Sequence, residues 1–117
     1  MGKLTTHVLD ISAGIPAAGL SIELRREDAG AVALLAIVAT GGDGRCAAPL
    51  LEGDAFTAGR YSLTFQVAAY FRARGVALPD PPFIDRAVIH FGIAHSNQHY
   101  HVPLLVSPWS YSVYRGG

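Results

Sequence analysis

Apolar and polar residues alternate along much of the chain. Residues 20–25 and 61–67 place an apolar side chain at every second position, a period typical of strands with one buried face. The first residues alternate in the same way, and three segments in the last third of the chain also have strand character. We therefore expect strands at residues 4–11, 20–25, 61–67, 85–93, 100–107 and 110–114, among seven or eight in all.

Turn and helix signals divide these strands. Gly14-Ile15-Pro16 separates the first two strands, and the glycine-rich segment 41–44 marks a turn between the third and fourth. Residues 68–75 predict a short helix, because they combine good helix formers, arginines near the end and Gly75 at the position of a C-cap. Prolines at 79, 81 and 82 prevent its continuation. The predicted fold is an all-β, antiparallel β-sandwich with one short helix, forming a single domain over residues 1–117.

Composition limits the classes of function. Nine basic and nine acidic side chains leave no net charge to neutralise phosphates, which argues against a nucleic-acid partner. The longest apolar run, residues 31–39, is too short for a membrane span of about 20 residues. Only 15% of the residues are charged, against about 25% in a typical domain. We expect copies of the chain to bury this apolar surface against one another.

The cysteine content bears on the compartment. Cys46 is the single cysteine and cannot form an internal disulfide, which favours a reducing compartment. The first residues contain no hydrophobic signal region. We therefore expect a cytoplasmic protein.

The histidines are the first candidates for chemistry. In the first strand, Thr5, His7 and Leu9 share one face, so His7 is either a half-exposed strand residue or a general base or hydrogen-bond donor. His99 and His101 also share a face of their strand.

Two imidazoles at this spacing allow a second interpretation, a zinc site. His95 or His7 would be the third ligand, but a zinc site needs about three or four ligands and no cysteine pair assists, so we assign no metal. The other interpretation makes one of the two histidines catalytic and places the other at the solvent end of the strand. Pro103 predicts that part of this strand's edge is unpaired or bulged.

The last residues, Tyr114-Arg115-Gly116-Gly117, are unusual for a tail. They are either a flexible solvated end or a segment tucked into a pocket, where glycines let the backbone pass close to a ligand. Arg115 would then offer a planar fork to a carbonyl-rich or anionic heterocycle. Arg45, after the turn, is a further cation or an ordinary surface arginine beside a hairpin.

These motifs together resemble those of the 5-hydroxyisourate hydrolase family, the transthyretin-related enzymes of urate breakdown. The resemblance covers nearly the whole chain. It is carried by Thr6-His7-Val8-Leu9-Asp10, Asp43-Gly44-Arg45, Tyr100-His101-Val102-Pro103-Leu104-Leu105 with Ser107-Pro108, and Tyr114-Arg115-Gly116.

The resemblance implies a transthyretin-like sandwich assembled as a homotetramer, with active sites in a channel at the dimer–dimer interface. It implies hydrolytic opening of 5-hydroxyisourate at an amide-like C–N bond to 2-oxo-4-hydroxy-4-carboxy-5-ureidoimidazoline, without cofactor or metal. The implied catalytic residues are His7, Arg45, His101, Tyr114 and Arg115, and the implied substrate-binding residues are His7, Arg45, Tyr114, Gly116 and Gly117. The family tail usually ends in serine, where this chain has Gly117.

A mechanism by direct attack of water fits these residues. His7 and His101 would activate water and transfer protons, in an order that the sequence leaves open. Arg45 and Arg115 would hold the carbonyls and the developing negative charge, and would keep the histidines neutral. Two alternatives remain: a transthyretin-like binding protein for a flat aromatic ligand, and a zinc enzyme using His99 and His101. Transthyretin itself lacks this histidine and arginine set, which favours the hydrolase.

Overall fold

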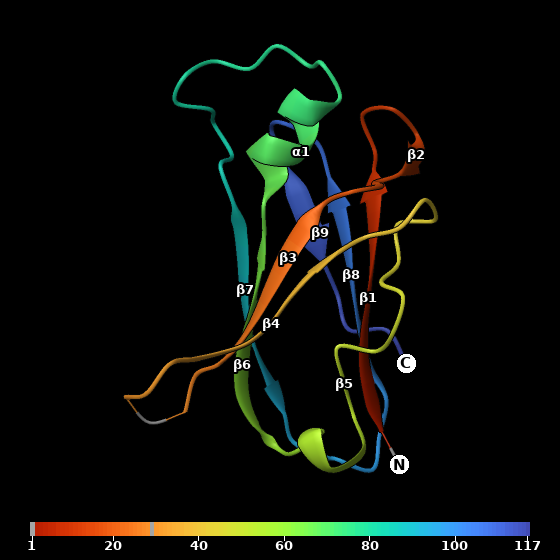
Figure 1. Cartoon of the computed structure of the whole chain (residues 1–117), viewed down its shortest axis with the longest axis vertical. Coiled ribbons are helices and arrows are strands. Elements are labelled where there is room, and N and C mark those ends of the chain that lie inside the picture. The colour runs from red at the N-terminus through yellow and green to blue at the C-terminus, as the bar shows by residue number, and fades with distance from the viewer. Residues whose placement is uncertain (1, 29) are drawn as a thin grey trace.

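Two β-sheets packed face to face make up the computed structural model, which describes residues 2–28 and 30–117 (Figure 1). The first sheet contains β1 (Lys3–Asp10), β2 (Ile15–Pro16), β5 (Leu51–Glu52), β8 (Tyr100–Val106) and β9 (Tyr111–Val113), in the order β2-β1-β8-β9 with β5 also paired to β1. The second contains β3 (Ser21–Arg26), β4 (Ala33–Ala39), β6 (Gly59–Phe65) and β7 (Ala87–Ile93), in the order β4-β3-β6-β7. The predicted β-sandwich is confirmed.

The strand count differs slightly from the prediction. The described residues form nine strands, and β2 and β5 are only two residues long, too short to produce a period in the sequence. Residues 14–16 were expected only to separate two strands. Instead, Ile15 and Pro16 pair with Asp10 and Leu9 across a tight turn in which Gly14 has a φ of 70°.

The pairing of β1 with β8 brings distant segments together. The strand pairs of the described residues are antiparallel apart from this parallel one, which runs from Leu4 beside Tyr100 to Asp10 beside Val106. In this register Thr5 lies beside His101, and His7 lies beside Pro103. The two histidine motifs are therefore neighbours on one sheet.

Three short segments complete the other edge of β1. β2 pairs at one end of the strand, and β5 pairs with Lys3 and Leu4 at the other. Between them an antiparallel bridge joins His7 to Arg45, and the Val8 N–H donates to the Gly44 carbonyl at 2.9 Å. The 41–44 turn is thus fixed against the middle of β1.

The predicted alternation in β1 is confirmed by its burial. Leu4, Thr6, Val8 and Asp10 are buried, whereas the residues between them are partly exposed. The Thr6 hydroxyl donates to the Val102 carbonyl at 2.7 Å, so burying this polar side chain leaves no group without a partner. The first sheet therefore turns one side to the core and the other, carrying His7, to solvent.

The helix α1 (Val67–Ala73) lies at one end of the sandwich (Figure 1). It begins one residue before the prediction and buries Val67, Ala68, Tyr70 and Phe71. Gly75 follows it with a φ of 83°, the left-handed conformation of a C-cap glycine. Among the described residues, no helix has the length and apolar character that crossing a membrane requires.

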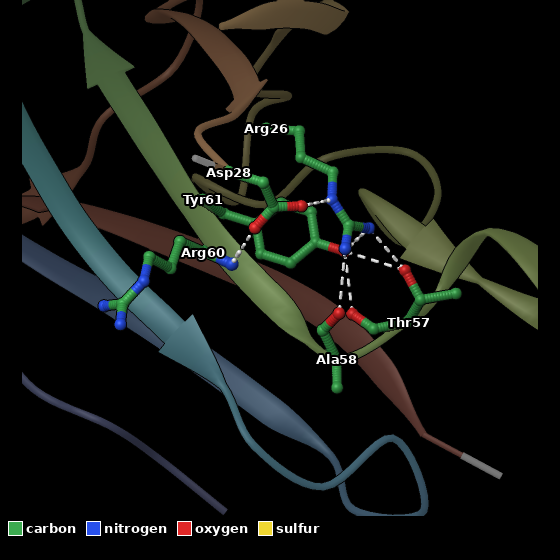
Figure 2. A network of polar contacts seen from close by, with 6 residues as sticks. All are labelled: Arg26, Asp28, Thr57, Ala58, Arg60 and Tyr61. Carbon is green, nitrogen blue, oxygen red and sulfur yellow. Dashed lines mark hydrogen bonds and ion pairs between the residues drawn. The ribbon is translucent and has the colours of Figure 1, made fainter. Parts of the chain in front are cut away.

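Arg26 joins the end of β3 to the segment that enters β6 (Figure 2). Its guanidinium donates to the Thr57 hydroxyl at 2.5 Å, the Tyr61 hydroxyl at 2.8 Å and the Ala58 carbonyl at 2.8 Å, and it pairs with Asp28. A Cβ on Gly59 would collide with this guanidinium. The network fixes this end of the second sheet.

Candidate active site

The outward face of β1 and β8 carries a polar pocket. Its volume is about 500 Å³, and its lining comes from β1, the turn after residue 41, the start of β8 and the tail. The lining residues are Lys3, Thr5, Arg45, His99, His101 and Gly117. The pocket therefore combines two fixed cations with imidazoles.

His101 is held on two sides in this pocket. Its Nδ1 is 2.8 Å from the Thr5 hydroxyl, across the parallel strand pair. On the other side the Gly116 N–H donates to the His101 carbonyl at 2.6 Å, and the His101 N–H donates to the Gly116 carbonyl at 3.3 Å. A Cβ on Gly116 would approach the imidazole Cδ2 to 3.0 Å, so the absence of a side chain lets the tail lie against the ring.

The environment of His101 favours the neutral imidazole. Partial burial lowers its pKa, and the positive charges of Arg45 and His7 lower it further, while a hydrogen bond to the Thr5 backbone acts in the opposite direction. A neutral imidazole can accept a proton from water at neutral pH. We expected this effect of Arg45 and Arg115, and the charges that lower the pKa of His101 are those of Arg45 and His7.

His7 is oriented by the neighbouring turn. Its Nε2 lies 2.8 Å from the Asp43 carbonyl oxygen. Because a carbonyl only accepts, Nε2 carries the proton, and the neutral ring presents Nδ1 as its acceptor. Gly44 has a φ of 78°, and a Cβ there would collide with the Val8 carbonyl, so glycine is required at this close approach of the turn to β1.

The tail re-joins β8 after a gap. β9 pairs Val113 with Leu104, and the bridge between Gly116 and His101 continues the same register. Between these points Tyr114 lies opposite Pro103, which has no N–H to donate. The gap in edge pairing that Pro103 predicted for this strand is therefore present in β8.

Arg115 departs from the expected arrangement. The register that places Gly116 opposite His101 places Arg115 opposite Val102, on the inner side of β8. Its guanidinium lies over the Tyr100 ring, 4.1 Å from the centroid, and donates from Nη2 to the His99 carbonyl at 2.9 Å and to Gln98 Oε1 at 3.2 Å. The expectation that Arg115 would share a pocket with Arg45 is therefore corrected, because alternate residues of a strand point to opposite faces.

Tyr114 and Arg115 line a second pocket instead. This pocket has a volume of about 230 Å³ and lies between the edges of the two sheets. It is mainly apolar, and its other lining residues are Ile89, Phe91, Gly92, Tyr100, Val102 and Val113. Of the four predicted tail residues, Gly117 lines the polar pocket, Gly116 lies against the His101 ring, and Tyr114 and Arg115 line the apolar pocket.

Sequence reasoning missed three contributors to the polar pocket. Lys3 and Thr5 alternate with buried residues and so share the face of His7, a signal that the period of β1 already contained. His99 appeared in the sequence only as a zinc ligand or a solvent-end residue, and it lines the pocket beside His101. In the described part of the chain, no three His, Cys, Asp or Glu side chains are arranged to hold a metal ion.

Comparison with known proteins gives concordant results. The HIUase/Transthyretin family model matches residues 4–116. The 5-hydroxyisourate hydrolase of Pseudomonas aeruginosa is 53% identical over 116 residues, which cover 99% of this chain and 92% of that protein.

Two solved structures are similar over the full chain. The Klebsiella pneumoniae 5-hydroxyisourate hydrolase has a TM-score of 0.82 and 38% identity, with both chains covered to 100%. An (S)-allantoin synthase has a TM-score of 0.94 and 44% identity, covering 99% of this chain but 44% of the other. The present chain thus spans less than half the length of that synthase.

Proposed function

The chain belongs to the HIUase/transthyretin family, and we propose that it hydrolyses 5-hydroxyisourate to 2-oxo-4-hydroxy-4-carboxy-5-ureidoimidazoline in urate degradation. The observation that carries this function is the position of His101. Burial and the charge of Arg45 lower the pKa of its imidazole, in a pocket that also holds a second cation, Lys3.

His101 is the proposed general base. With Nδ1–H donating to Thr5, the neutral ring presents Nε2 to a water molecule. The water oxygen attacks the carbonyl carbon of the amide-like C–N bond while its proton passes to His101. A base placed in this way contributes about 10²–10⁴-fold to the rate.

Arg45 stabilises the charge that develops on the attacked carbonyl. Its guanidinium lines the pocket, and its backbone is fixed by the bridge to His7 and by the hydrogen bond from its N–H to Asp43 Oδ1 at 2.9 Å. A preorganised cation is most effective at the position where negative charge appears during the reaction. The tetrahedral intermediate then collapses: the C–N bond breaks, and the leaving nitrogen takes a proton from the imidazolium.

His7 assists from the adjacent strand position. Its Nε2–H is engaged by Asp43, so its Nδ1 is the atom that can accept a hydrogen bond from substrate or water. When His7 is protonated, its charge lowers the pKa of His101 further. Gly117 lines the tail side of the pocket, and Gly116 packs against the His101 ring.

We propose that the chain assembles into a homotetramer. Large apolar side chains are exposed where β1 and β8 end. Ile11 lies there, because its N–H donates to the Val106 carbonyl. Phe83 and Trp109 are 73% and 60% exposed, and their ring centroids are 6.0 Å apart. Contact between copies would remove this surface from water. We also assign a cytoplasmic location, on the free thiol of Cys46.

The test compares His101→Ala and His7→Ala with the control His90→Ala. His90 is an exposed histidine of β7, where it faces Glu27 in the second sheet. Chelator-treated proteins are assayed by the ultraviolet decay of 5-hydroxyisourate made in situ from urate, and sedimentation gives their oligomeric state. We expect the control to match the wild type and both other variants to lose at least about 100-fold in rate as folded tetramers.

Two outcomes would overturn the proposal. Wild-type rates in folded His7→Ala and His101→Ala tetramers would exclude the assigned residues. Failure of the wild-type protein to accelerate the decay would favour a binding protein for a flat aromatic ligand.

A further inference from the structure

The tail lies against His101 although its pairing with β8 is broken on the way. Pro103 cannot donate to Tyr114, and the pairing resumes only at Gly116, next to the last residue. A terminal segment held by one such bridge would ordinarily fray. Something other than the β-ladder must therefore hold this segment in place.

Arg115 supplies that anchor. Its guanidinium lies over the Tyr100 ring and donates to the His99 carbonyl and to Gln98 Oε1. These three partners belong to residues 98–100, the segment that enters β8 directly before His101. The anchor therefore ties the tail to the backbone that carries the histidine.

We propose that Arg115 is a positioning residue, which clamps the tail to residues 98–100 and so holds Gly116 against the His101 imidazole. The proposal rests on the function proposed above, because His101 acts there as the general base. It assigns Arg115 to the inner side of β8, away from the substrate, in place of the direct contact with substrate carbonyls that the sequence suggested.

The geometry of the clamp requires arginine. A planar guanidinium can stack on an aromatic ring with its face while its edge donates hydrogen bonds. Lysine keeps the charge but has neither the plane nor the fork. Replacing Arg115 with lysine therefore separates the effect of charge from the effect of the clamp.

The clamp also affects the proton affinity of His101. The charged and titratable groups around that ring are Lys3 and His7 on β1, Arg45 on the turn, and His99 before β8. Partial burial is the largest cause of the lowered pKa of His101, and Gly116 is one of the groups that cover the ring. Release of the tail should expose the imidazole and raise its pKa toward the ordinary value of about 6.5.

The experiment uses the full chain with Arg115→Lys and Arg115→Gln, and with Arg86→Gln as the control. Arg86 is an exposed arginine directly before β7, in the second sheet. Three quantities are measured: kcat and KM against pH, the titration of His101 by NMR, and the exchange rate of the Gly116 N–H. Sedimentation confirms that each variant keeps the wild-type assembly.

Both Arg115 variants should lower kcat by about 10- to 100-fold with a small change in KM, since misplacing a catalytic group by about 1 Å can cost about 100-fold. The His101 titration should move to higher pH, and the Gly116 N–H should exchange faster. Lysine at position 115 should restore neither kcat, nor the His101 titration, nor the exchange rate of the Gly116 N–H.

Two results would contradict the clamp. A raised KM with unchanged kcat and an unchanged His101 titration would show that Arg115 binds substrate, and wild-type behaviour of both variants would remove any role for it. If the wild-type protein does not hydrolyse 5-hydroxyisourate, the proposed function fails, while the titration and the amide exchange still decide whether Arg115 positions Gly116.

Discussion

Replacing Thr5 with valine should slow the reaction while leaving the strand intact. Valine has nearly the shape of threonine and favours β-structure, so the change removes one hydroxyl from the outward face of β1. That hydroxyl lies 2.8 Å from His101 Nδ1, on a strand whose backbone is fixed by the parallel pairing with β8. The substitution therefore tests the orientation of the imidazole with little other disturbance.

The expected magnitude follows from one hydrogen bond. A neutral hydrogen bond contributes about 1 kcal/mol net, and about 1.4 kcal/mol in a barrier corresponds to a tenfold change in rate. If the bond serves only to hold the ring and its tautomer, kcat should fall by about fivefold, and further if the proton moves to the other nitrogen. KM should change little.

The assay is the initial rate of 5-hydroxyisourate decay for Thr5→Val and for Thr5→Ser, which restores the hydroxyl. Serine should recover most of the wild-type kcat. A wild-type kcat in Thr5→Val, or a Thr5→Ser variant as slow as Thr5→Val, would refute a role for the hydroxyl in orienting His101.

Two further predictions concern charge and stability. The positive charge of Arg45 lowers the pKa of His101, so the acid limb of kcat/KM should move to higher pH in Arg45→Gln. The measurement is a profile of kcat/KM against pH, and an acid limb that stays in place would exclude His101 as the base. Asp10 is buried and accepts hydrogen bonds from Ser12 Oγ at 2.6 Å and the Tyr70 hydroxyl at 2.9 Å, so Asp10→Ala should lower the free energy of unfolding in urea by about 2–4 kcal/mol, and Asp10→Asn by less. Burial alone would raise the pKa of Asp10, but these hydrogen bonds and those from the backbone outweigh burial and lower the pKa. The stabilisation by the carboxylate is therefore complete above the unfolded pKa of about 3.9, and it is lost as pH falls through the lower folded pKa. A loss of stability below 0.5 kcal/mol in Asp10→Ala would contradict this account of the carboxylate, taking about 1 kcal/mol as the least cost of an unpaired buried group.

Local patterns in the sequence predicted those features of the fold that depend on neighbouring residues. The alternation in β1, the helix before Gly75 and the turn before Arg45 each need only a few consecutive residues. The parallel pairing of β1 with β8 joins residues almost a hundred positions apart, and no local period specifies such a partner. For the same reason the contact between Thr5 and His101 could not be predicted, although both residues were placed on the correct faces of their strands.

The position of Arg115 shows how register decides which residues can act together. Residue types alone suggested that two arginines and two histidines would share one pocket. In the structure the register of the tail determines which residues face the pocket. Because Gly116 lies opposite His101, the Arg115 side chain points to the opposite face of the sheet. A shift of the tail by one residue would bring Arg115 to the His101 face and would turn Gly116 inward, removing both the clamp and the close approach to the imidazole. The order of arginine before glycine in this tail is therefore a structural requirement: each residue type is needed on the face that the register gives it.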